Sequence, residues 1–276
     1  MKQKLIRLDK FITDRKLAAS RTAAQNYIEE GRVTVGGVTI TKAASMVPQD
    51  ASVKIDAPER EWVSRGAYKL LKAIESFAIK ADGRRCVDIG ASTGGFTEVL
   101  LANGAAKVYA VDVGYGQLAW KLRGDPRVAV LERTNARNLT LEMIDGEKAD
   151  IVVSDASFIS ITLLLPKMEE LLKEDGLMAV LVKPQFEAGR EKVGKKGVVR
   201  DPAVHLEVLE HFLEHAKESR FTVLGLTYSP IRGPEGNIEY LGYLSRAEEE
   251  PPVHDLKALV EASHAALEEK KGENDA

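Results

Sequence analysis

The sequence contains very little cysteine and histidine. Cys86 is the only cysteine among 276 residues, so no internal disulfide is possible, and there are five histidines. No His and Cys residues have the spacing of a zinc site, so we expect no metal. Cys86 lies in an apolar run, and we interpret it as a core residue rather than a nucleophile.

Long apolar runs are also absent. No stretch approaches the roughly 18 apolar residues that a membrane span requires. The first ten residues contain Lys2, Lys4, Arg7 and Lys10 and lack the apolar segment of a signal peptide. We therefore expect a cytoplasmic protein that does not enter a membrane.

Charge is unevenly distributed along the chain. The net charge is −3, but residues 1–60 carry 11 Lys and Arg against 7 Asp and Glu, whereas residues 248–276 carry 3 against 9. A basic N-terminal module favours a polyanionic partner. An excess this small also fits chance, so charge alone leaves both interpretations open.

Residues 5–60 have the pattern of a small α+β module. Leu5, Leu8, Phe11 and Ile12 fall at helical spacing, and Ser20 can cap a second helix that stops at Gly31. Short strands are expected afterwards. Their ranges are 33–35, 38–40 and 53–55, and Gly36-Gly37 joins the first two in a hairpin.

This module resembles the S4 RNA-binding domain. The resemblance rests on Arg7-Leu8-Asp9, on Ser20-Arg21-Thr22-Ala23-Ala24, and on Gly31 to Val35. It implies a helix face that lies on structured RNA, where cationic and hydroxyl groups contact phosphates. The candidate contacts are Arg7, Lys16, Ser20, Arg21, Asn26 and Arg32. The alternative is a solvated basic face.

After this module the pattern alternates between strands and helices, which predicts an α/β fold with a mostly parallel seven-stranded sheet of the Rossmann-like type. The expected strands are 85–89, 107–112, 128–131, 150–154, 177–182, 221–228 and 239–244, the last two antiparallel. The expected helices are 96–103, 116–122, 161–173 and 203–218. We divide the chain into an S4 domain (1–60), a linker (61–65) whose Trp62 packs at the junction, a catalytic domain (66–246) and an acidic tail (247–276) with a weak amphipathic helix.

A glycine-rich turn follows the first of these strands. Asp88 lies near the end of that strand, and Gly90, Gly94 and Gly95 follow it. Position 92 is Ser, so the spacing differs from the dinucleotide fingerprint. An acid at the strand end suits a cationic ligand, which points to S-adenosylmethionine (SAM). An unrelated α/β turn is the alternative.

Other strand ends supply further candidates for the cofactor. Asp112, after the next strand, is placed to accept hydrogen bonds from ribose hydroxyls, and Asn135 could contact adenine. The full set of expected cofactor residues is Asp88, Gly90, Ala91, Ser92, Gly94, Asp112 and Asn135.

Four ionisable residues have distinctive positions. Asp155 and Lys183 follow strands, Glu239 begins the last strand, and Lys69 precedes the sheet. Two lysines and two acids at neighbouring strand ends could form one buried, charge-balanced cluster. A structural ion-pair network is the alternative.

The whole chain from about residue 5 to 246 resembles the TlyA family of ribosomal RNA 2′-O-methyltransferases, whose catalytic domain is of the FtsJ type. The resemblance rests on residues 64–70, 88–96, 112–118, 132–137, 155–160, 183–187 and 236–239. It departs from the usual pattern only at Ala67 and Ala156. It implies a catalytic tetrad of Lys69, Asp155, Lys183 and Glu239, SAM as cofactor, ribosomal RNA or ribosomal subunits as partner, and cytidine as the nucleoside.

The chemistry of methyl transfer to a ribose hydroxyl fits these residue types. A neutral hydroxyl is a poor nucleophile, so a base must take its proton. Lys183 is our candidate base and Asp155 would orient it, while Lys69 would hold the hydroxyl or stabilise developing negative charge. Glu239 would orient a lysine, and which lysine takes the proton stays open.

Residues 186–200 form a basic, glycine-containing loop. We interpret it as an RNA-contacting lid, and a disordered charged loop is the alternative. The candidate RNA contacts outside the S4 module are Arg65, Arg190, Lys195 and Lys196.

Two other functions remain as alternatives. One is a ribosome-docking module that no longer catalyses, which the intact tetrad argues against. The other is a membrane-active hemolysin, since relatives have carried that label. The oligomeric state is left open.

Overall fold

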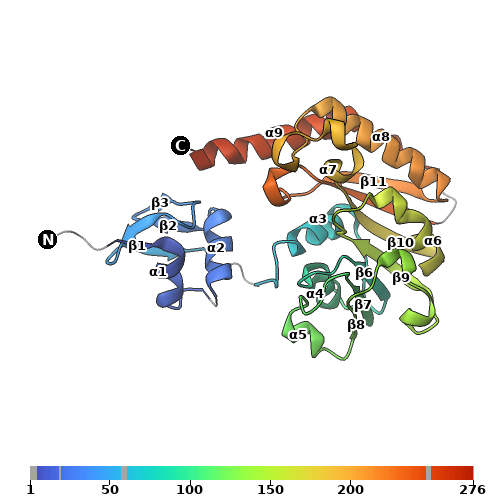
Figure 1. Cartoon of the computed structure of the whole chain (residues 1–276), viewed down its shortest axis with the longest axis horizontal. Coiled ribbons are helices and arrows are strands. Elements are labelled where there is room, and N and C mark those ends of the chain that lie inside the picture. The colour runs from blue at the N-terminus through green and yellow to red at the C-terminus, as the bar shows by residue number, and fades with distance from the viewer. Residues whose placement is uncertain (1–4, 19, 57–60, 247–249, 276) are drawn as a thin grey trace. The chain divides into compact units, whose positions relative to one another are not determined.

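The computed structural model describes residues 5–18, 20–56, 61–246 and 250–275. The chain divides into two compact units, residues 1–61 together with 270–276, and residues 62–269. Figure 1 shows both units, and each is described here by itself.

The N-terminal unit packs two helices on short strands. Its sheet has the order β3-β2-β5, and β1 pairs with β4. Gly36 and Gly37 both have positive φ, as the predicted hairpin between β2 and β3 requires. The elements are β1 (Leu5–Arg7), α1 (Leu8–Asp14), α2 (Arg21–Glu29), β2 (Val33–Val35), β3 (Val38–Thr39), β4 (Met46–Pro48) and β5 (Val53–Ile55).

Leu5 does not lie on the first helix as the apolar spacing predicted. It is half exposed in β1, which pairs antiparallel with β4, and α1 begins at Leu8. The core of the unit is built from Leu8, Phe11 and Ile12 of α1 together with side chains of α2 and β2. A strand ladder with β4 therefore overrides the helical spacing at Leu5.

The second unit is a seven-stranded sheet with the order β11-β12-β10-β9-β6-β7-β8, which confirms the predicted α/β class. β12 pairs antiparallel with β10 and β11, and the other neighbours are parallel. The strands are β6 (Arg85–Ile89), β7 (Lys107–Val111), β8 (Val128–Leu131), β9 (Ala149–Ser154), β10 (Leu172–Val182), β11 (Thr222–Tyr228) and β12 (Tyr240–Ser245).

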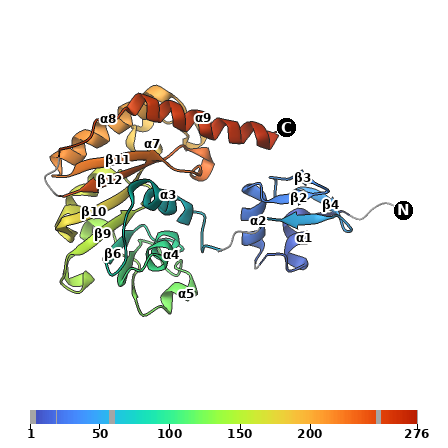
Figure 2. The same ribbon diagram turned by 180° about the vertical axis from the view of Figure 1, so that it is seen from behind.

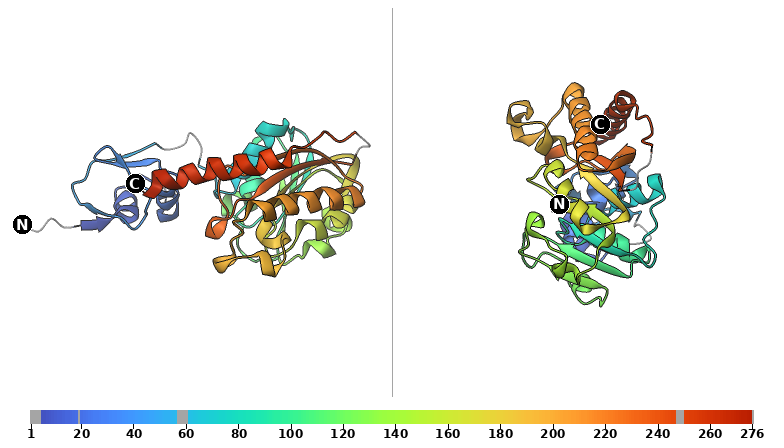
Figure 3. Two further views of the ribbon diagram at one scale, coloured as in Figure 1. Left: turned by 90° about the horizontal axis from the view of Figure 1, so that it is seen from above. Right: turned by 90° about the vertical axis from the view of Figure 1, so that its right-hand side faces the viewer.

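Helices cover both faces of this sheet. Side chains alternate along each strand, so Cys86 packs with α3 and α4 on one face, while Val87 packs with α6 and α8 on the other. Figure 2 shows α3 and α4 in front of the sheet, and the left view of Figure 3 shows α8 on the opposite side from α3. The α-helices are α3 (Ala67–Phe77), α4 (Gly95–Ala102), α5 (Trp120–Arg123), α6 (Leu165–Leu171), α7 (Pro184–Glu187), α8 (Pro202–Glu218) and α9 (Leu256–Asp275). The 3₁₀ turns are η1 (Ala136–Asn138), η2 (Glu142–Ile144), η3 (Ile161–Leu163), η4 (Arg190–Lys192), η5 (Lys195–Gly197) and η6 (Pro234–Gly236).

Two predicted helices are shorter than the apolar spacing indicated. Residues 116–119 are not helical, because Glu132 accepts hydrogen bonds from three successive backbone N–H groups there and Gly116 has positive φ. Range 161–173 divides into η3 and α6, and Leu172 already belongs to β10. Side-chain caps and strand pairing decide both boundaries.

The segment predicted as an acidic tail contains α9, whose first turns pack on the second unit. Val260 and Leu267 join the core under α8, and Ser263 is fully buried. Ser263 shares a 3.0 Å hydrogen bond with the hydroxyl of Tyr240 and donates to Val260 O. The hydroxyl of the serine that interrupts the apolar face therefore has a hydrogen-bond partner on β12. None of the helices in the described ranges has the length and apolar character of a membrane span.

This packing predicts that α9 contributes to stability. Leu267→Ala should lower the free energy of unfolding by about 2–5 kcal/mol, because the substitution leaves a cavity in the core. Lys257→Ala, at an exposed position of the same helix, serves as the matched control. Urea unfolding monitored by circular dichroism measures both. Equal midpoints for the two variants would show that α9 is not part of the folded unit.

Candidate active site

A large cavity lies at the carboxyl ends of the parallel strands. Its volume is about 1230 Å³, and its walls come from the segments that follow β6, β7, β8, β9 and β10. Predicted site residues among its lining are Gly90, Ser92, Asp112, Asn135, Asp155 and Arg190.

The turn after β6 approaches the segment after β9 very closely. A Cβ atom at Gly90 would lie 2.9 Å from the backbone N and Cα of Ala156, and Gly90 has a φ of +83°. Any other residue at position 90 would push these two segments apart. Gly90 is therefore required by the way the cavity wall is built.

Asp112 organises the next part of the wall. Its Oδ2 accepts a hydrogen bond from Ser92 N at 2.7 Å, and its Oδ1 accepts one from Gly114 N at 2.7 Å. Each oxygen keeps a second lone pair, so the carboxylate can still accept from a ligand. Asn135 caps η1 by accepting from Arg137 N at 3.0 Å.

Asp88 is completely buried at the end of β6 and does not line the cavity. Thr97 Oγ1 donates to its Oδ2 at 2.6 Å, whereas Oδ1 has no hydrogen-bond partner in the structure. Burial raises the pKa of Asp88 to about 7, against the effect of Thr97, and the charges of Asp155 and Asp112 add to the rise. Three carboxyl groups therefore converge on this end of the sheet.

Ala91 and Gly94 are also absent from the cavity wall. Ala91 is buried and its N donates to Val111 O at 3.1 Å. Gly94 has a φ of +98°, and a Cβ there would lie 2.2 Å from Leu122 Cδ1. These two residues shape the turn and its packing against α5.

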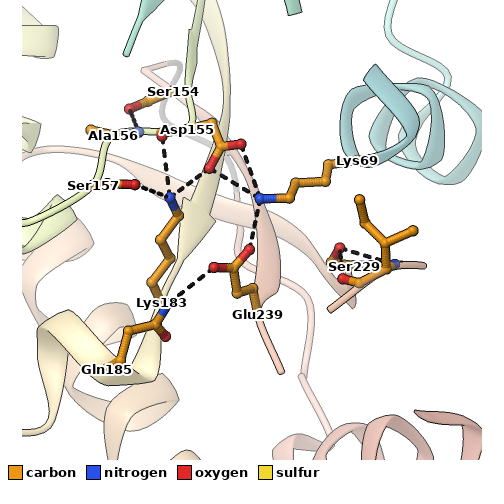
Figure 4. Close-up of polar contacts among 10 residues, drawn as sticks. Lys69, Ser154, Asp155, Ala156, Ser157, Lys183, Gln185, Ser229 and Glu239 are labelled. Atoms are coloured by element: carbon orange, nitrogen blue, oxygen red, sulfur yellow. Dashed lines mark hydrogen bonds and ion pairs between the residues drawn. The ribbon is translucent and has the colours of Figure 1, made fainter. Parts of the chain in front are cut away.

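The four predicted catalytic side chains meet in one cluster, drawn in Figure 4. Lys69 Nζ lies 3.0 Å from Asp155 Oδ2 and 2.7 Å from Glu239 Oε2. Lys183 Nζ lies 2.6 Å from Asp155 Oδ1. Glu239 can join because β12 runs antiparallel, so its start faces the end of β10 at the pair Val182 and Tyr240. Two cations and two anions make the cluster neutral, which allows its burial.

The two lysines have different surroundings. Burial disfavours the charged form of Lys69, but the carboxylates of Asp155 and Glu239 outweigh it and raise the pKa of Lys69 above its ordinary value. Lys183 has a single carboxylate partner, Asp155, and donates to two neutral oxygens, Ser157 Oγ at 2.9 Å and Asp155 O at 3.2 Å. Lys69 is thus held as a cation by two carboxylates.

Two residues that support the cluster were not singled out from the sequence. Ser157 accepts from Lys183, and Gln185 Nε2 donates to Glu239 Oε1 at 3.0 Å. Both lie inside the segments 155–160 and 183–187 that carried the family resemblance. Gly233 leaves room for Glu239, because a Cβ there would lie 2.3 Å from Glu239 Oε1.

Two aromatic side chains line the cavity next to the cluster. Phe158 is 93% exposed with a φ of +65°, an unfavourable backbone conformation for a bulky residue. Its ring lies 5.5 Å from that of Phe186. An exposed phenyl group held in this way offers a flat apolar surface at the cavity.

The basic loop 186–200 is anchored at both ends. At its start, Glu187 accepts from Ser160 Oγ at 2.5 Å and Ile161 N at 2.8 Å. At its end, Asn237 Nδ2 donates to Gly197 O at 2.9 Å, and Asn237 Oδ1 accepts from Val199 N at 3.1 Å. The predicted RNA contacts Arg190, Lys195 and Lys196 are exposed between these anchors, and Arg65 is partly buried.

The residues predicted to contact RNA in the N-terminal unit differ in their exposure and in whether they bind other residues of the unit. Arg7 and Arg21 both bind the buried Asp9, and Arg32 pairs with Glu30 at 2.9 Å. Ser20 caps α2 through Ala23 N at 3.0 Å. Lys16 is exposed and Asn26 is partly buried.

Two family models match the chain. The model described as FtsJ-like methyltransferase matches residues 62–246, and the model described as S4 domain matches residues 6–53. The fold and the site thus define an FtsJ-like methyltransferase joined to an S4 domain.

Similar proteins with known names identify the family within this class of methyltransferases. The 16S/23S rRNA (cytidine-2′-O)-methyltransferase TlyA of Mycobacterium tuberculosis is 47% identical over 95% of this chain and 97% of its own length. Hemolysin A of Brachyspira hyodysenteriae is 41% identical over 86% of this chain and 99% of its own. A solved structure of a candidate hemolysin from Streptococcus thermophilus is 37% identical, with a TM-score of 0.76, covering 98% of this chain and 99% of that one. The chain belongs to the TlyA family of methyltransferases, as its sequence predicted.

Proposed function

We propose that this enzyme transfers a methyl group from SAM to the 2′-hydroxyl of a cytidine in ribosomal RNA. The observation that carries the proposal is the neutral cluster of Lys69, Asp155, Lys183 and Glu239, joined to the cavity through Asp155. A hydroxyl placed beside Asp155 would have both lysines within reach, since each lies within 3.0 Å of a carboxylate oxygen.

The cavity suits SAM on physical grounds. Asp88 lies behind the cavity wall with its Oδ1 unpartnered, and a positively charged ligand in the cavity would stabilise its ionised form through space. Asp112 can accept from ribose hydroxyls, and the converging carboxyl groups favour a ligand with two positive charges. Asp112 and Asn135 would hold the cofactor, Gly90 and Ser92 would shape its wall, and Asp88 would act on the positive charges of the ligand from behind that wall. SAM supplies an electrophilic methyl group when bound.

The protein's own groups would activate the hydroxyl. Lys183 would first release one proton to solvent and then, as a neutral amine, accept the hydroxyl proton. We assign it this role because it has a single carboxylate partner and two neutral ones. Lys69, held cationic by two carboxylates, would stabilise the negative charge that develops on oxygen. Asp155 would orient both ammonium groups, and Glu239, fixed by Gln185, would orient Lys69.

The nucleotide would reach this site across a partly basic and aromatic rim. Phe158 offers a surface on which a base can stack, and Arg190 offers a phosphate contact. The S4 unit would dock on folded RNA through Arg7, Lys16, Ser20 and Arg21.

The hemolysin names of some relatives suggest a second function, but no described feature favours it, whereas the cluster favours catalysis. An inactive docking module is the other alternative.

Transfer of radiolabelled methyl from SAM to isolated bacterial ribosomal subunits tests the proposal. Label on RNA, mapped to a cytidine ribose, would support it. Absence of label from both subunits, with SAM binding intact, would contradict it and leave the docking module.

Arg21→Glu should weaken binding to these subunits without changing SAM affinity. The reason is that a cation on the exposed face of α2 becomes an anion facing phosphates. Filter binding between 50 and 200 mM salt measures the effect, and wild-type affinity should fall steeply over that range. Unchanged affinity in the variant would exclude this face as the docking surface.

A further inference from the structure

The N-terminal unit contains one buried carboxylate that binds two of its exposed arginines. Asp9 is fully buried at the start of α1. Its Oδ1 accepts from Arg7 Nε at 3.1 Å and from Lys10 N at 2.8 Å. Its Oδ2 accepts from Arg7 Nη2, Arg21 Nη2 and Gln25 Nε2 at 2.9, 3.0 and 3.0 Å.

The two guanidinium groups are therefore neighbours, although Arg7 ends β1 and Arg21 begins α2. Both place a terminal nitrogen about 3 Å from the same oxygen. Their side chains are nevertheless 44% and 54% exposed, so each group has one edge on the carboxylate and another toward solvent. The contacts to Asp9 use Nε and Nη2 of each arginine, which leaves Nη1 to donate outward.

Charge and geometry together indicate an anionic ligand. Two cations side by side repel, and Asp9 compensates only one of them. The trio keeps an excess charge of +1 on two planar forks held in fixed directions, which matches the oxygens of a phosphate. A flexible pair of surface arginines would have to lose side-chain entropy on binding, and Asp9 removes that cost in advance.

We propose that Asp9 makes Arg7 and Arg21 into a single binding site for a phosphate of the RNA backbone. Asp9 is a positioning residue and does not touch the RNA itself. The inference rests on the proposed function, since it assigns a role in docking the RNA substrate.

Asp9→Asn separates this role from simple electrostatics. By charge alone, removing an anion from an RNA-binding face should tighten binding. By the proposed positioning, binding to ribosomal subunits should weaken about tenfold. The negative slope of log affinity against log salt should decrease in magnitude by about 1, the value for one lost phosphate contact. Asp14→Asn is the matched control, because Asp14 is exposed on the same helix, and its affinity should be unchanged or slightly higher.

A double-mutant cycle gives a second readout that structural damage would not produce. Arg21→Lys keeps the positive charge but lacks the planar guanidinium group with its parallel N–H donors. It should therefore weaken RNA binding in the wild-type protein and have little further effect in a protein that already carries Asp9→Asn. If Asp9→Asn lowers the thermal stability of the unit, the proposal is tested by the binding of the Arg7→Lys and Arg21→Lys variants to ribosomal subunits.

The possible outcomes separate the role of Asp9 from the proposed function. Equal or tighter binding by folded Asp9→Asn, or wild-type binding by both lysine variants, would overturn the role of Asp9 and leave the proposed function in place. No binding of subunits by the wild-type protein would overturn both.

Discussion

Lys183→Ala should reduce methyl transfer to ribosomal RNA by about 10²–10⁴-fold, the usual contribution of a positioned proton acceptor. Lys183 is buried beside Asp155 and is not among the residues that line the cavity, so SAM affinity should stay close to the wild-type value. Single-turnover transfer of labelled methyl measures the first quantity, and calorimetric titration with SAM measures the second.

The matched control lies at the opposite end of the strand that Lys183 follows. Lys173 belongs to the other end of β10 and pairs with Asp150 on the surface, so Lys173→Ala should retain full activity. A Lys183→Ala enzyme that keeps more than a tenth of wild-type turnover would remove Lys183 from the proton path. Loss of SAM binding in that variant would instead assign Lys183 to the cofactor site.

The position of each tetrad residue could be predicted from the sequence because each has a local signature. Asp155 and Lys183 directly follow buried apolar runs, and the ends of parallel strands meet at one edge of the sheet. The contacts themselves could not be predicted in the same way. Lys69 and Glu239 are 170 residues apart, and their pairing depends on the register of β12 against β10.

Side-chain caps account for several details that the sequence pattern missed. Glu132 accepts from the N–H groups of Gly116, Gln117 and Leu118 and pairs with Arg123, so the apolar spacing there does not become a helix. Apolar periodicity carries no information on such partners, because they come from a different strand end.

Buried polar residues were the hardest to interpret from the sequence. Ser263 interrupts the apolar face of a weakly amphipathic helix, and Asp9 is one residue of the S4 motif Arg7-Leu8-Asp9. Neither pattern identifies the partner of the polar group. Each becomes intelligible once its partner is known, the Tyr240 hydroxyl for Ser263 and two arginines for Asp9. A polar residue at a core position thus predicts a partner without naming it.

Asp88→Asn should have opposite effects on cofactor binding and on stability. Loss of the carboxylate removes a negative charge that acts on the cationic ligand from behind the cavity wall, so SAM affinity should fall by about 10- to 100-fold. The protein without ligand should become more stable at pH 8, because the buried charge of Asp88, whose pKa is raised to about 7 by burial, is gone.

The sign of the pH dependence follows from the raised pKa. Between pH 4 and pH 7 the unfolded chain has lost the proton of Asp88 while the folded protein keeps it, so wild-type stability decreases as pH rises through this range. At about 1.4 kcal/mol per pH unit, Asp88 alone accounts for a decrease of about 4 kcal/mol. Asp88→Asn should lack this decrease, and Asp175→Asn, at an exposed position, should keep it.

Urea unfolding at pH 5 and pH 8 without SAM tests this expectation. The advantage of Asp88→Asn over the wild-type protein should be larger at pH 8 than at pH 5. The same advantage at both values would mean that Asp88 does not carry a buried charge in the folded protein. A larger advantage at pH 8 together with weaker SAM binding would show that Asp88 destabilises the protein without ligand. It would also show that a cationic ligand compensates this cost, because its positive charge stabilises the buried carboxylate.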